Sequence, residues 1–475
     1  MKTTHTKNSH EPPDFSLVLG GPLFQLLVRS RLSTSALELV TRRIVVISLF
    51  AWLPLLILSL VDGKAWGGIG LPFLYDIEMQ VRFLVALPLL ISAELLVNQR
   101  LRLVVGQFVE REIIAEEVLP KFKEAVASAM KLRNSVVLEL ALFILIFVGG
   151  YYLWSTMSGI EEISSGKETW YAAVKDGGTQ PSAAGYWYIF VSRPLFQFIL
   201  VRWYFRLFIW ARFLWQTSRL ELDLIPTHPD RAAGLGFLGA SIASFTPLLL
   251  AHGALLAGLI ANPIFFAGAK LTDFKLEIIG GVGVLLIFLL GPLLVYTPCL
   301  MRAKRAGLRE YGMLASRYVR EFDRKWVRGG AADDEQLIGS GDIQSLADLA
   351  NSFQVIRDIQ PFPFSRDAVI RLIVITLIPV SPLVLTMIPL EELIKKLLGQ
   401  FYDVGRFFGK RIDENSLGLR RKGMKPSKYL VLSVFVLSLF TWAELEADRR
   451  LFPSGAGQGG RDASLFPCRL TWASS

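Results

Sequence analysis

Long apolar runs alternate with charged connecting segments along most of the chain. A helix of about 20 apolar residues crosses the hydrocarbon core of a bilayer. Six runs meet this condition, a seventh is interrupted by Pro379 and Pro382, and an eighth, Tyr429–Ala443, has only fifteen residues. We therefore predict an all-α fold, a polytopic helical membrane bundle of six to eight transmembrane helices. The first seven predicted spans are 44–61, 81–97, 135–154, a helix that begins at 186, 237–261, 278–300 and 368–389.

The run that begins at Tyr186 differs from the others in composition. It carries thirteen aromatic residues in thirty-one, yet it also contains four arginines. An ionisable group inside a span costs about 2.5–3.5 kcal/mol on insertion scales, so these side chains are expected to face other helices or water rather than lipid. After this helix the chain passes through a polar turn and becomes apolar again at Phe237. We name the turn, residues 223–239, the elbow.

The charged connecting segments predict helices outside the apolar zone. Segment 98–134 is rich in helix formers and predicts two surface helices broken at Pro120. Segment 302–367 begins with a basic amphipathic helix, which either packs beneath the bundle or docks on anionic headgroups. Its apolar face comprises Leu308, Tyr311, Ala315, Tyr318, Phe322 and Trp326.

The predicted domain organisation follows from these segments. A cytoplasmic N-terminal segment precedes a transmembrane domain with cytoplasmic helical insertions, and an atypical C-terminal extension, partly disordered, follows. The N-terminal segment is 1–43, the transmembrane domain is 44–400, the insertions are 98–134 and 302–367, and the extension is 401–475.

The distribution of Lys and Arg predicts the orientation. Connecting segments on one side carry 28 basic residues and those on the other side carry 5. The positive-inside rule therefore predicts a cytoplasmic N-terminus. The ten basic residues of 391–428 break the alternation if 368–389 crosses, so that run is either a re-entrant element or a local exception. The basic side comprises 1–43, 98–134, 206–236 and 302–367, and the other side comprises 62–80, 155–185 and 262–277.

Composition excludes several classes of function. Apolar residues make up 52% of the chain and charged residues 19%, more apolar than one soluble core requires. The net charge of +10 comes from basic residues beside apolar runs, which indicates contact with lipid headgroups rather than nucleic acid. Cys299 and Cys468 form no CxxC motif, so the sequence predicts no zinc site, no disulfide framework and no cofactor.

Several stretches are similar to a group of bacterial multi-pass membrane proteins. They are RWYFRLFIWARFLWQTSRLELDLIPTHPDRAAGLGFL, LLLAHGALLAGLIANPIFFAG, LREYGMLASRYVREFDRKW, IQSLADLANSFQVIRDI and TMIPLEEL. The resemblance covers about residues 15–400 and leaves out the extension. It implies an integral protein of the bacterial inner membrane, and it implies no particular activity.

Ionisable residues within the spans form two predicted layers of a polar seam. The layer near the inner ends suggests either Glu–Arg pairing and snorkelling to headgroups, or a polar pathway for a proton or anion. The second layer lies about 10–13 Å from the outer ends, at 1.5 Å per residue. In it, Arg193 precedes Pro194, which frees a backbone group, and His252 is either a packed histidine or a proton relay. The inner layer is Glu94, Glu139, Arg202, Arg206 and Arg371, and the outer layer is Arg193 and His252.

The elbow is the second candidate site. Gly234, Gly236 and Gly239 spell GxGxxG, but no strand precedes them, so a dinucleotide-binding turn is excluded. Two interpretations remain: the amides of a helix N-terminus bind an anion with Arg231, or Asp230 caps a tight turn. His228 and Asp230 alone do not make a metal centre.

Three hypotheses for function follow. The first is binding or transport of a small anionic solute or lipid headgroup through the polar seam, with membrane lipids as partners. The second is a membrane-embedded enzyme acting on lipid-linked phosphate at His228, Asp230 and Arg231. The third is a non-catalytic membrane scaffold. A continuous cavity joining Arg193 to the elbow favours transport, a closed pocket at the elbow favours an enzyme, and a solid bundle favours a scaffold.

Overall fold

The computed structural model describes residues 15–22, 25, 29, 39–149, 168–175, 178–332, 335–337 and 339–387. The described residues belong to one compact unit, Met1–Lys395. The predicted span 429–443 and the predicted C-terminal extension lie outside the described residues.

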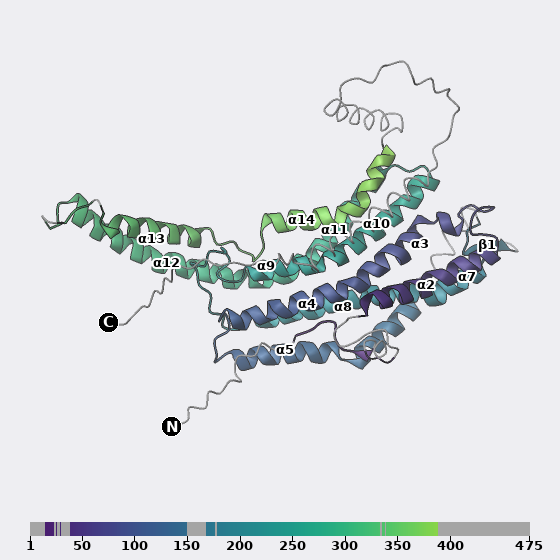
Figure 1. Ribbon diagram of the computed structural model, residues 1–475, viewed down its shortest axis with the longest axis horizontal. Coiled ribbons are helices and arrows are strands. Elements are labelled where there is room, and N and C mark those ends of the chain that lie inside the picture. The colour runs from purple at the N-terminus through teal and green to yellow at the C-terminus, as the bar shows by residue number, and fades with distance from the viewer. Residues whose placement is uncertain are drawn as a thin grey trace, which may run out of the picture. The chain divides into compact units, whose positions relative to one another are not determined.

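The described part of the chain is mostly helical, and five helical runs are long and apolar enough to cross a membrane (Figure 1). Two helices bent by 43°, Leu119–Arg133 (α5) and Val136–Gly149, make a sixth if they count as one span. The predicted helical class is therefore confirmed. The five runs are Val40–Val61, Ile77–Glu110, Phe237–Phe266, Leu271–Val327 and Arg366–Met387.

Most of these runs consist of α-helices continued by π-helical or 3-10-helical segments. The π-helical segments are Arg82–Ala86 (η2), Tyr188–Ser192 (η3) and Asp323–Val327 (η7). The 3-10 helices are Phe73–Tyr75 (η1), Ile242–Phe245 (η4), Leu271–Phe274 (η5), Gly291–Tyr296 (η6) and Ile378–Met387 (η8). The α-helices are Val40–Val61 (α2), Ile77–Val81 (α3), Leu87–Glu110 (α4), Leu119–Arg133 (α5), Ala183–Trp187 (α7), Arg193–Thr217 (α8), Phe237–Ser241 (α9), Thr246–Phe266 (α10), Lys275–Leu290 (α11), Thr297–Phe322 (α12), Gly341–Arg357 (α13) and Arg366–Leu377 (α14).

The arginine-bearing helix α8 is not among the apolar runs, yet it lies alongside α4 (Figure 1). Trp203 is fully buried, and its indole N–H donates to the Leu90 carbonyl of α4 at 2.9 Å. Arg202 and Arg206 on the same helix are buried as well. Two arginines of α8 therefore face neighbouring helices, as the sequence predicts.

Alternate connecting segments meet at two ends of this unit. At one end, Gly70 N donates to the Glu168 carbonyl, beside the antiparallel hairpin Ala172–Lys175 (β1) and Gly178–Pro181 (β2). At the other end, Asp223 N in the elbow donates to the Ile113 carbonyl. The helices thus run back and forth, as in a multi-pass bundle.

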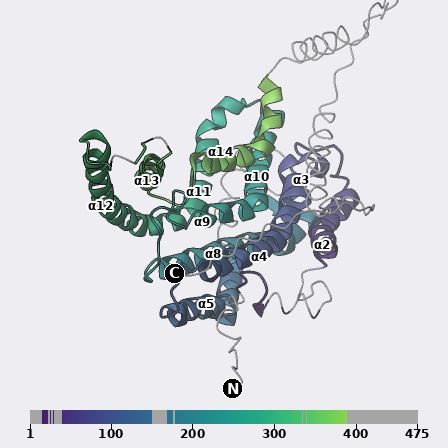
Figure 2. The same ribbon diagram turned by 60° about the vertical axis from the view of Figure 1, so that its left-hand side comes forward.

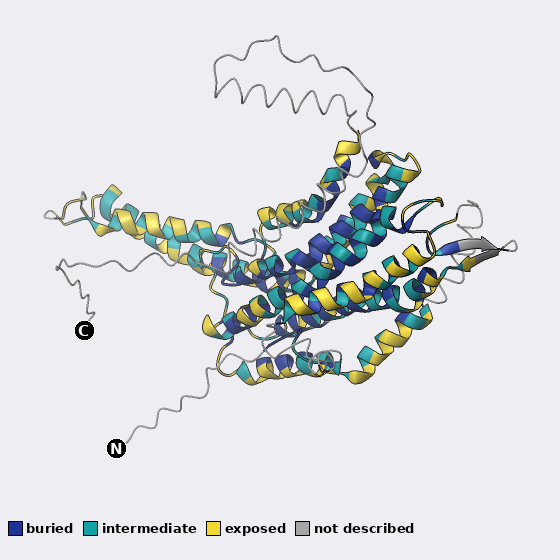
Figure 3. Cartoon of the chain, turned by 45° about the vertical axis from the view of Figure 1, so that its right-hand side comes forward, coloured by how far each residue is buried: buried dark blue, intermediate teal, exposed yellow. Residues whose placement is uncertain are grey.

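The two predicted insertions differ in detail from the structure. Helix α4 continues to Glu110, and Pro120 lies in the first turn of α5, where a proline needs no N–H partner. The predicted break at Pro120 is therefore wrong, and the chain turns at 111–118. The basic helix α12 packs against α13, where the Tyr318 hydroxyl donates to the Asp342 carbonyl at 3.0 Å. Both helices are largely intermediate or exposed (Figure 3).

In the described part of the chain, close helix packing occurs at Gly253 on α10, and not at Gly280 or Gly283 on α11. Among the described residues, a Cβ at Gly280 or Gly283 would have no heavy atom within 4 Å, so no described backbone approaches closely there. On α10, by contrast, a Cβ at Gly253 would overlap the Thr376 carbonyl oxygen of α14. Figure 2 shows α14 beside α10 and α11. The side chain missing from Gly253 is therefore what lets α14 pack on α10.

We predict that Gly253→Ala lowers the melting temperature of the detergent-solubilised protein, because the added methyl group separates α10 from α14. Overpacking costs about 1–3 kcal/mol. Gly283→Ala is the matched control, since it fills open space and gains up to about 1 kcal/mol of helix propensity. Equal melting temperatures for the two variants would contradict this packing.

Candidate ligand-binding cavities

Five charged residues form a buried network, which we name the Glu94 cluster: Arg43, Glu94, Glu139, Arg202 and Arg206. One carboxylate oxygen of Glu94 accepts from Arg206 at 2.7 Å, and the other is paired with Arg43. Arg202 lies 3.4 Å from Glu139 and also donates to the Gly20 carbonyl. The cluster links α2, α4, α8 and the helix Val136–Gly149.

The Glu94 cluster is a structural network. Arg43 and Arg206 are only 1% and 3% exposed, so each charge depends on its partner. The adjoining cavity has a volume of about 10 Å³, which leaves room for at most one water molecule. The geometry confirms the Glu–Arg pairing interpretation of Glu94, Glu139, Arg202 and Arg206. Arg43 was missed because its position at the start of a span suggested a flanking charge.

We predict that Glu94→Ala destabilises the protein by about 3–5 kcal/mol, because it leaves two buried guanidinium groups without a carboxylate. Thermal unfolding in detergent measures the loss. Glu321→Ala removes an exposed ion pair with Arg317 and serves as the control, with an expected change of about 0–1 kcal/mol. Similar unfolding of both variants would show that the cluster does not support the fold.

A cavity of about 940 Å³ lies between α3, η3, α8, α10 and α11. We name it the Arg193 cavity. Two of the predicted seam residues, Arg193 and His252, line it together. The polar residues of its wall are Asp76, Glu78, Arg82, Tyr171, Tyr188, Arg193, Gln197, Tyr204, His252, Asn262 and Thr376.

Arg193 is the cation of this cavity that lacks a direct partner. The neighbouring Arg82 is paired with Glu78 and donates to the Tyr188 hydroxyl at 2.6 Å. Within the part of the chain that the structure describes, the Arg193 guanidinium has neither a hydrogen bond nor an ion pair. It is half-buried at the start of α8, just before Pro194. An anionic group in the cavity would complete its coordination.

The carboxylate of Asp76 is occupied by structural hydrogen bonds. It accepts from the Met79 amide at 3.2 Å, from the Trp170 indole at 2.9 Å and from the Asn262 side chain at 2.9 Å. These bonds join the start of α3, the segment before β1 and the end of α10. Asp76 therefore closes one end of the cavity rather than providing a free acid.

Two hydrogen bonds fix the ring of His252. One ring nitrogen lies 2.7 Å from the Leu248 carbonyl, which can only accept, so that nitrogen donates. The other ring nitrogen lies 2.7 Å from the Tyr204 hydroxyl and forms a hydrogen bond with it. The geometry favours the packed histidine over the proton relay.

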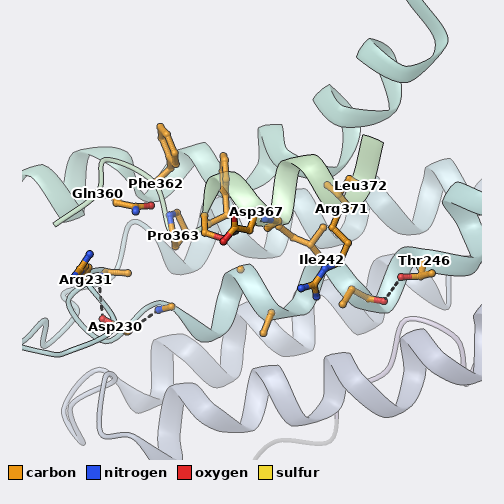
Figure 4. Close-up of a pocket in the computed structure, with 18 of the residues that line it drawn as sticks. Asp230, Arg231, Ile242, Thr246, Gln360, Phe362, Pro363, Asp367, Arg371 and Leu372 are labelled. Carbon is orange, nitrogen blue, oxygen red and sulfur yellow. Dashed lines mark hydrogen bonds between the residues drawn. The ribbon is translucent and has the colours of Figure 1, made fainter. Parts of the chain in front are cut away.

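A second cavity, of about 480 Å³, lies between the elbow, η4 and α14 (Figure 4). We name it the Arg371 cavity. Arg371 points from α14 toward Ile242, while Asp230 and Arg231 lie at the far end, and Gln360, Asp367 and Thr246 complete the polar wall.

The two cavities lie on opposite sides of one contact. On α14, Ile375 lines the Arg371 cavity and the next residue, Thr376, lines the Arg193 cavity. On α10, Thr246 borders the Arg371 cavity and His252 borders the Arg193 cavity. The close packing of Gly253 on Thr376 lies at this boundary. The predicted polar seam is thus divided into the Glu94 cluster and two separate cavities.

Asp230 organises the elbow through its carboxylate. One oxygen accepts from the amides of Ala232 at 2.8 Å and Gly234 at 3.1 Å, and the other accepts from Gly236 at 2.8 Å. Arg231 and Ala233 have positive φ angles of 54° and 52°, which this network of bonds maintains. The predicted turn cap is present, and the carboxylate occupies the amides that the anion-binding hypothesis requires. His228 pairs with Asp230 at 2.9 Å and does not line the cavity.

Partial burial acts to raise the pKa of Asp230, but the three backbone amides and His228 outweigh it, so the pKa lies below its usual value. A carboxyl group with a lowered folded-state pKa stabilises the fold above its unfolded pKa of about 3.9 and loses this effect as pH falls through the folded value. We predict that Asp230→Asn lowers stability near neutral pH and makes the melting temperature less sensitive to acid below about pH 4.

Asp223→Asn, an exposed change within the same elbow, is the control for this pH profile. Identical acid sensitivity in the wild type and Asp230→Asn would contradict the role of the cap.

Several residues of the Arg193 cavity were not found from the sequence. Glu78 lies just before the predicted span 81–97 and Arg82 lies at its start, so neither was assigned to the seam. Their spacing of four residues is nevertheless typical of a helical ion pair. Asp76 and Asn262 are 186 residues apart and gave no signal. The chain matches no protein-family model, no curated protein and no solved structure.

Proposed function

We propose that this chain is an integral protein of the bacterial inner membrane with a cytoplasmic N-terminus. The exposed apolar side chains on α2, the helix Val136–Gly149 and α11 support insertion, because surfaces of this kind are stable in lipid and rare in soluble monomers. Val137 and Leu276, for example, are each 77% exposed. The excess of Lys and Arg in 98–134 and 302–367 supports the orientation.

Within this membrane domain, we propose that the Arg193 cavity binds an anionic group. The observation that carries the proposal is a guanidinium in the wall of a 940 Å³ cavity with no hydrogen bond or ion pair to any residue that the structure describes. In an apolar environment a guanidinium is stabilised strongly by an anionic oxygen, preferably through two hydrogen bonds. The other cation of the wall, Arg82, is already paired.

We further propose that the bound group passes between the two cavities. Arg371 supplies a second cation on the other side of the Gly253–Thr376 contact. Separation of α14 from α10 would join the cavities, and the prolines of η8 at 379 and 382 weaken the backbone hydrogen bonding that holds α14 straight. A closed contact between two cavities is the arrangement that alternating access requires.

The two alternative functions have less support. An enzyme at the elbow needs His228 to face a pocket, yet His228 does not line the Arg371 cavity, and the Asp230 carboxylate is occupied by three backbone amides. A scaffold needs no internal cavity of 940 Å³.

The proposal predicts that purified protein in lipid vesicles moves a phosphate-bearing probe. Two probes cover the soluble and the lipid form of one chemistry, glycerol 3-phosphate and a fluorescent phosphatidic acid. Arg193→Gln should reduce the rate for the transported probe at least tenfold, whereas Arg309→Gln, an exposed change on α12, should leave it unchanged. Movement of neither probe, or equal rates in wild type and Arg193→Gln, would refute transport through this cavity.

A further inference from the structure

The Arg193 cavity has a polar part and an apolar part. The charged and amide groups come mainly from α3, η2 and the end of α10. A continuous apolar wall is formed by one face of α10 and the facing side of α11. Its residues are Leu255, Leu256, Leu259, Val284 and Leu285. A small hydrophilic anion would gain nothing from this wall, whereas an amphiphile would bury its chain there.

The α11 side of the cavity is thinly covered. Gly280 and Gly281 line the cavity, and a Cβ at Gly280 would meet no heavy atom within 4 Å. Neighbouring side chains on α11 face away from the rest of the chain, with Ile279 67% and Ile287 71% exposed. In a membrane these residues contact acyl chains, so the glycines separate the cavity from lipid by little more than a helix backbone.

The charges at the polar end fit an anionic headgroup. Arg193 forms no hydrogen bond or ion pair with the residues that the structure describes, and the Glu78 carboxylate next to it is held by Arg82. The Tyr188 hydroxyl already accepts from Arg82 and retains its proton for a second acceptor. A phosphate oxygen can therefore accept from Arg193 and Tyr188.

We propose that the ligand of the Arg193 cavity is a lipid with an anionic phosphate headgroup. The phosphate binds Arg193, and the first part of an acyl chain lies against Leu256 and Val284 and passes α11 at Gly280 into the bilayer. The inference rests on the proposed function and names its substrate class. The cavity volume lies at the upper end of the range for ligand pockets, about 300–1,000 Å³, so the remainder of a two-chain lipid extends into the membrane.

Gly280→Trp tests the proposed path of the acyl chain, because the indole side chain fills the space beside the cavity. Gly283→Trp is the matched control, since it lies on the same helix, meets no heavy atom and does not line the cavity. Both changes alter helix propensity equally. Dioleoyl phosphatidic acid and glycerol 3-phosphate are the probes, and native mass spectrometry in detergent and thermal shift measure their binding.

We expect wild type and Gly283→Trp to bind phosphatidic acid at least tenfold more tightly than glycerol 3-phosphate. Gly280→Trp and Arg193→Gln should each weaken lipid binding at least tenfold. If Gly280→Trp does not fold, Gly280→Leu introduces a smaller obstruction at the same place and should weaken binding in the same direction.

The outcomes separate the two proposals. Binding of glycerol 3-phosphate that depends on Arg193 and ignores Gly280 would overturn the lipid assignment and leave the proposed function intact. Lipid binding that is insensitive to both residues would indicate lipid bound around the outside of the bundle and would also overturn the assignment. Binding of neither probe would reject both proposals.

Discussion

The structure depends on how the arginines of α8 are neutralised inside an apolar bundle. A guanidinium cannot lose its proton at physiological pH, so each one needs a carboxylate, a carbonyl oxygen or water. Arg206 has Glu94, and Arg202 has Glu139 and the Gly20 carbonyl. These pairs fix the rotation of α8 and position its neighbours around it. Aromatic side chains fill the remaining space. The Trp203 ring, for example, lies beneath Arg206, with 4.8 Å between the guanidinium carbon and the ring centroid.

The same constraint gives Arg193 its significance. It lies half-buried on the same helix, yet it faces a cavity, and the described residues give it no ion pair of the kind that Arg202 and Arg206 have. Asp76, Arg82 and His252 around it are all occupied by hydrogen bonds within the chain. Among the described residues, the cavity therefore presents one cation without a hydrogen bond or ion pair, within a wall whose other polar groups are mostly satisfied. This is the arrangement of a binding site with one dominant electrostatic contact.

The sequence predicted the helical class and the inward-facing arginines because both follow from local composition. The pairing of Glu94 and Glu139 with arginines was one of its two interpretations of the inner layer, because depth along a helix follows from residue number. It placed Arg193 and Arg202 in two layers of one polar seam, but it did not predict that Arg202 is paired with Glu139 while Arg193 lines a cavity. That depends on which neighbours face each side of α8. Likewise, only the placement of α10 and α14 shows that Gly280 and Gly283 on α11 border open space.

The central claim is that α8 crosses the bilayer with its arginines directed at protein. The most direct test places single cysteines at Gln180 and Glu221, exposed residues on either side of α8, in a chain with Cys299 and Cys468 replaced by serine. A membrane-impermeant thiol reagent is applied to intact and to permeabilised cells. We predict that the cysteine at 180 is labelled in intact cells and that the one at 221 is labelled only after permeabilisation. Labelling of both positions from the same side would show that α8 does not span the membrane.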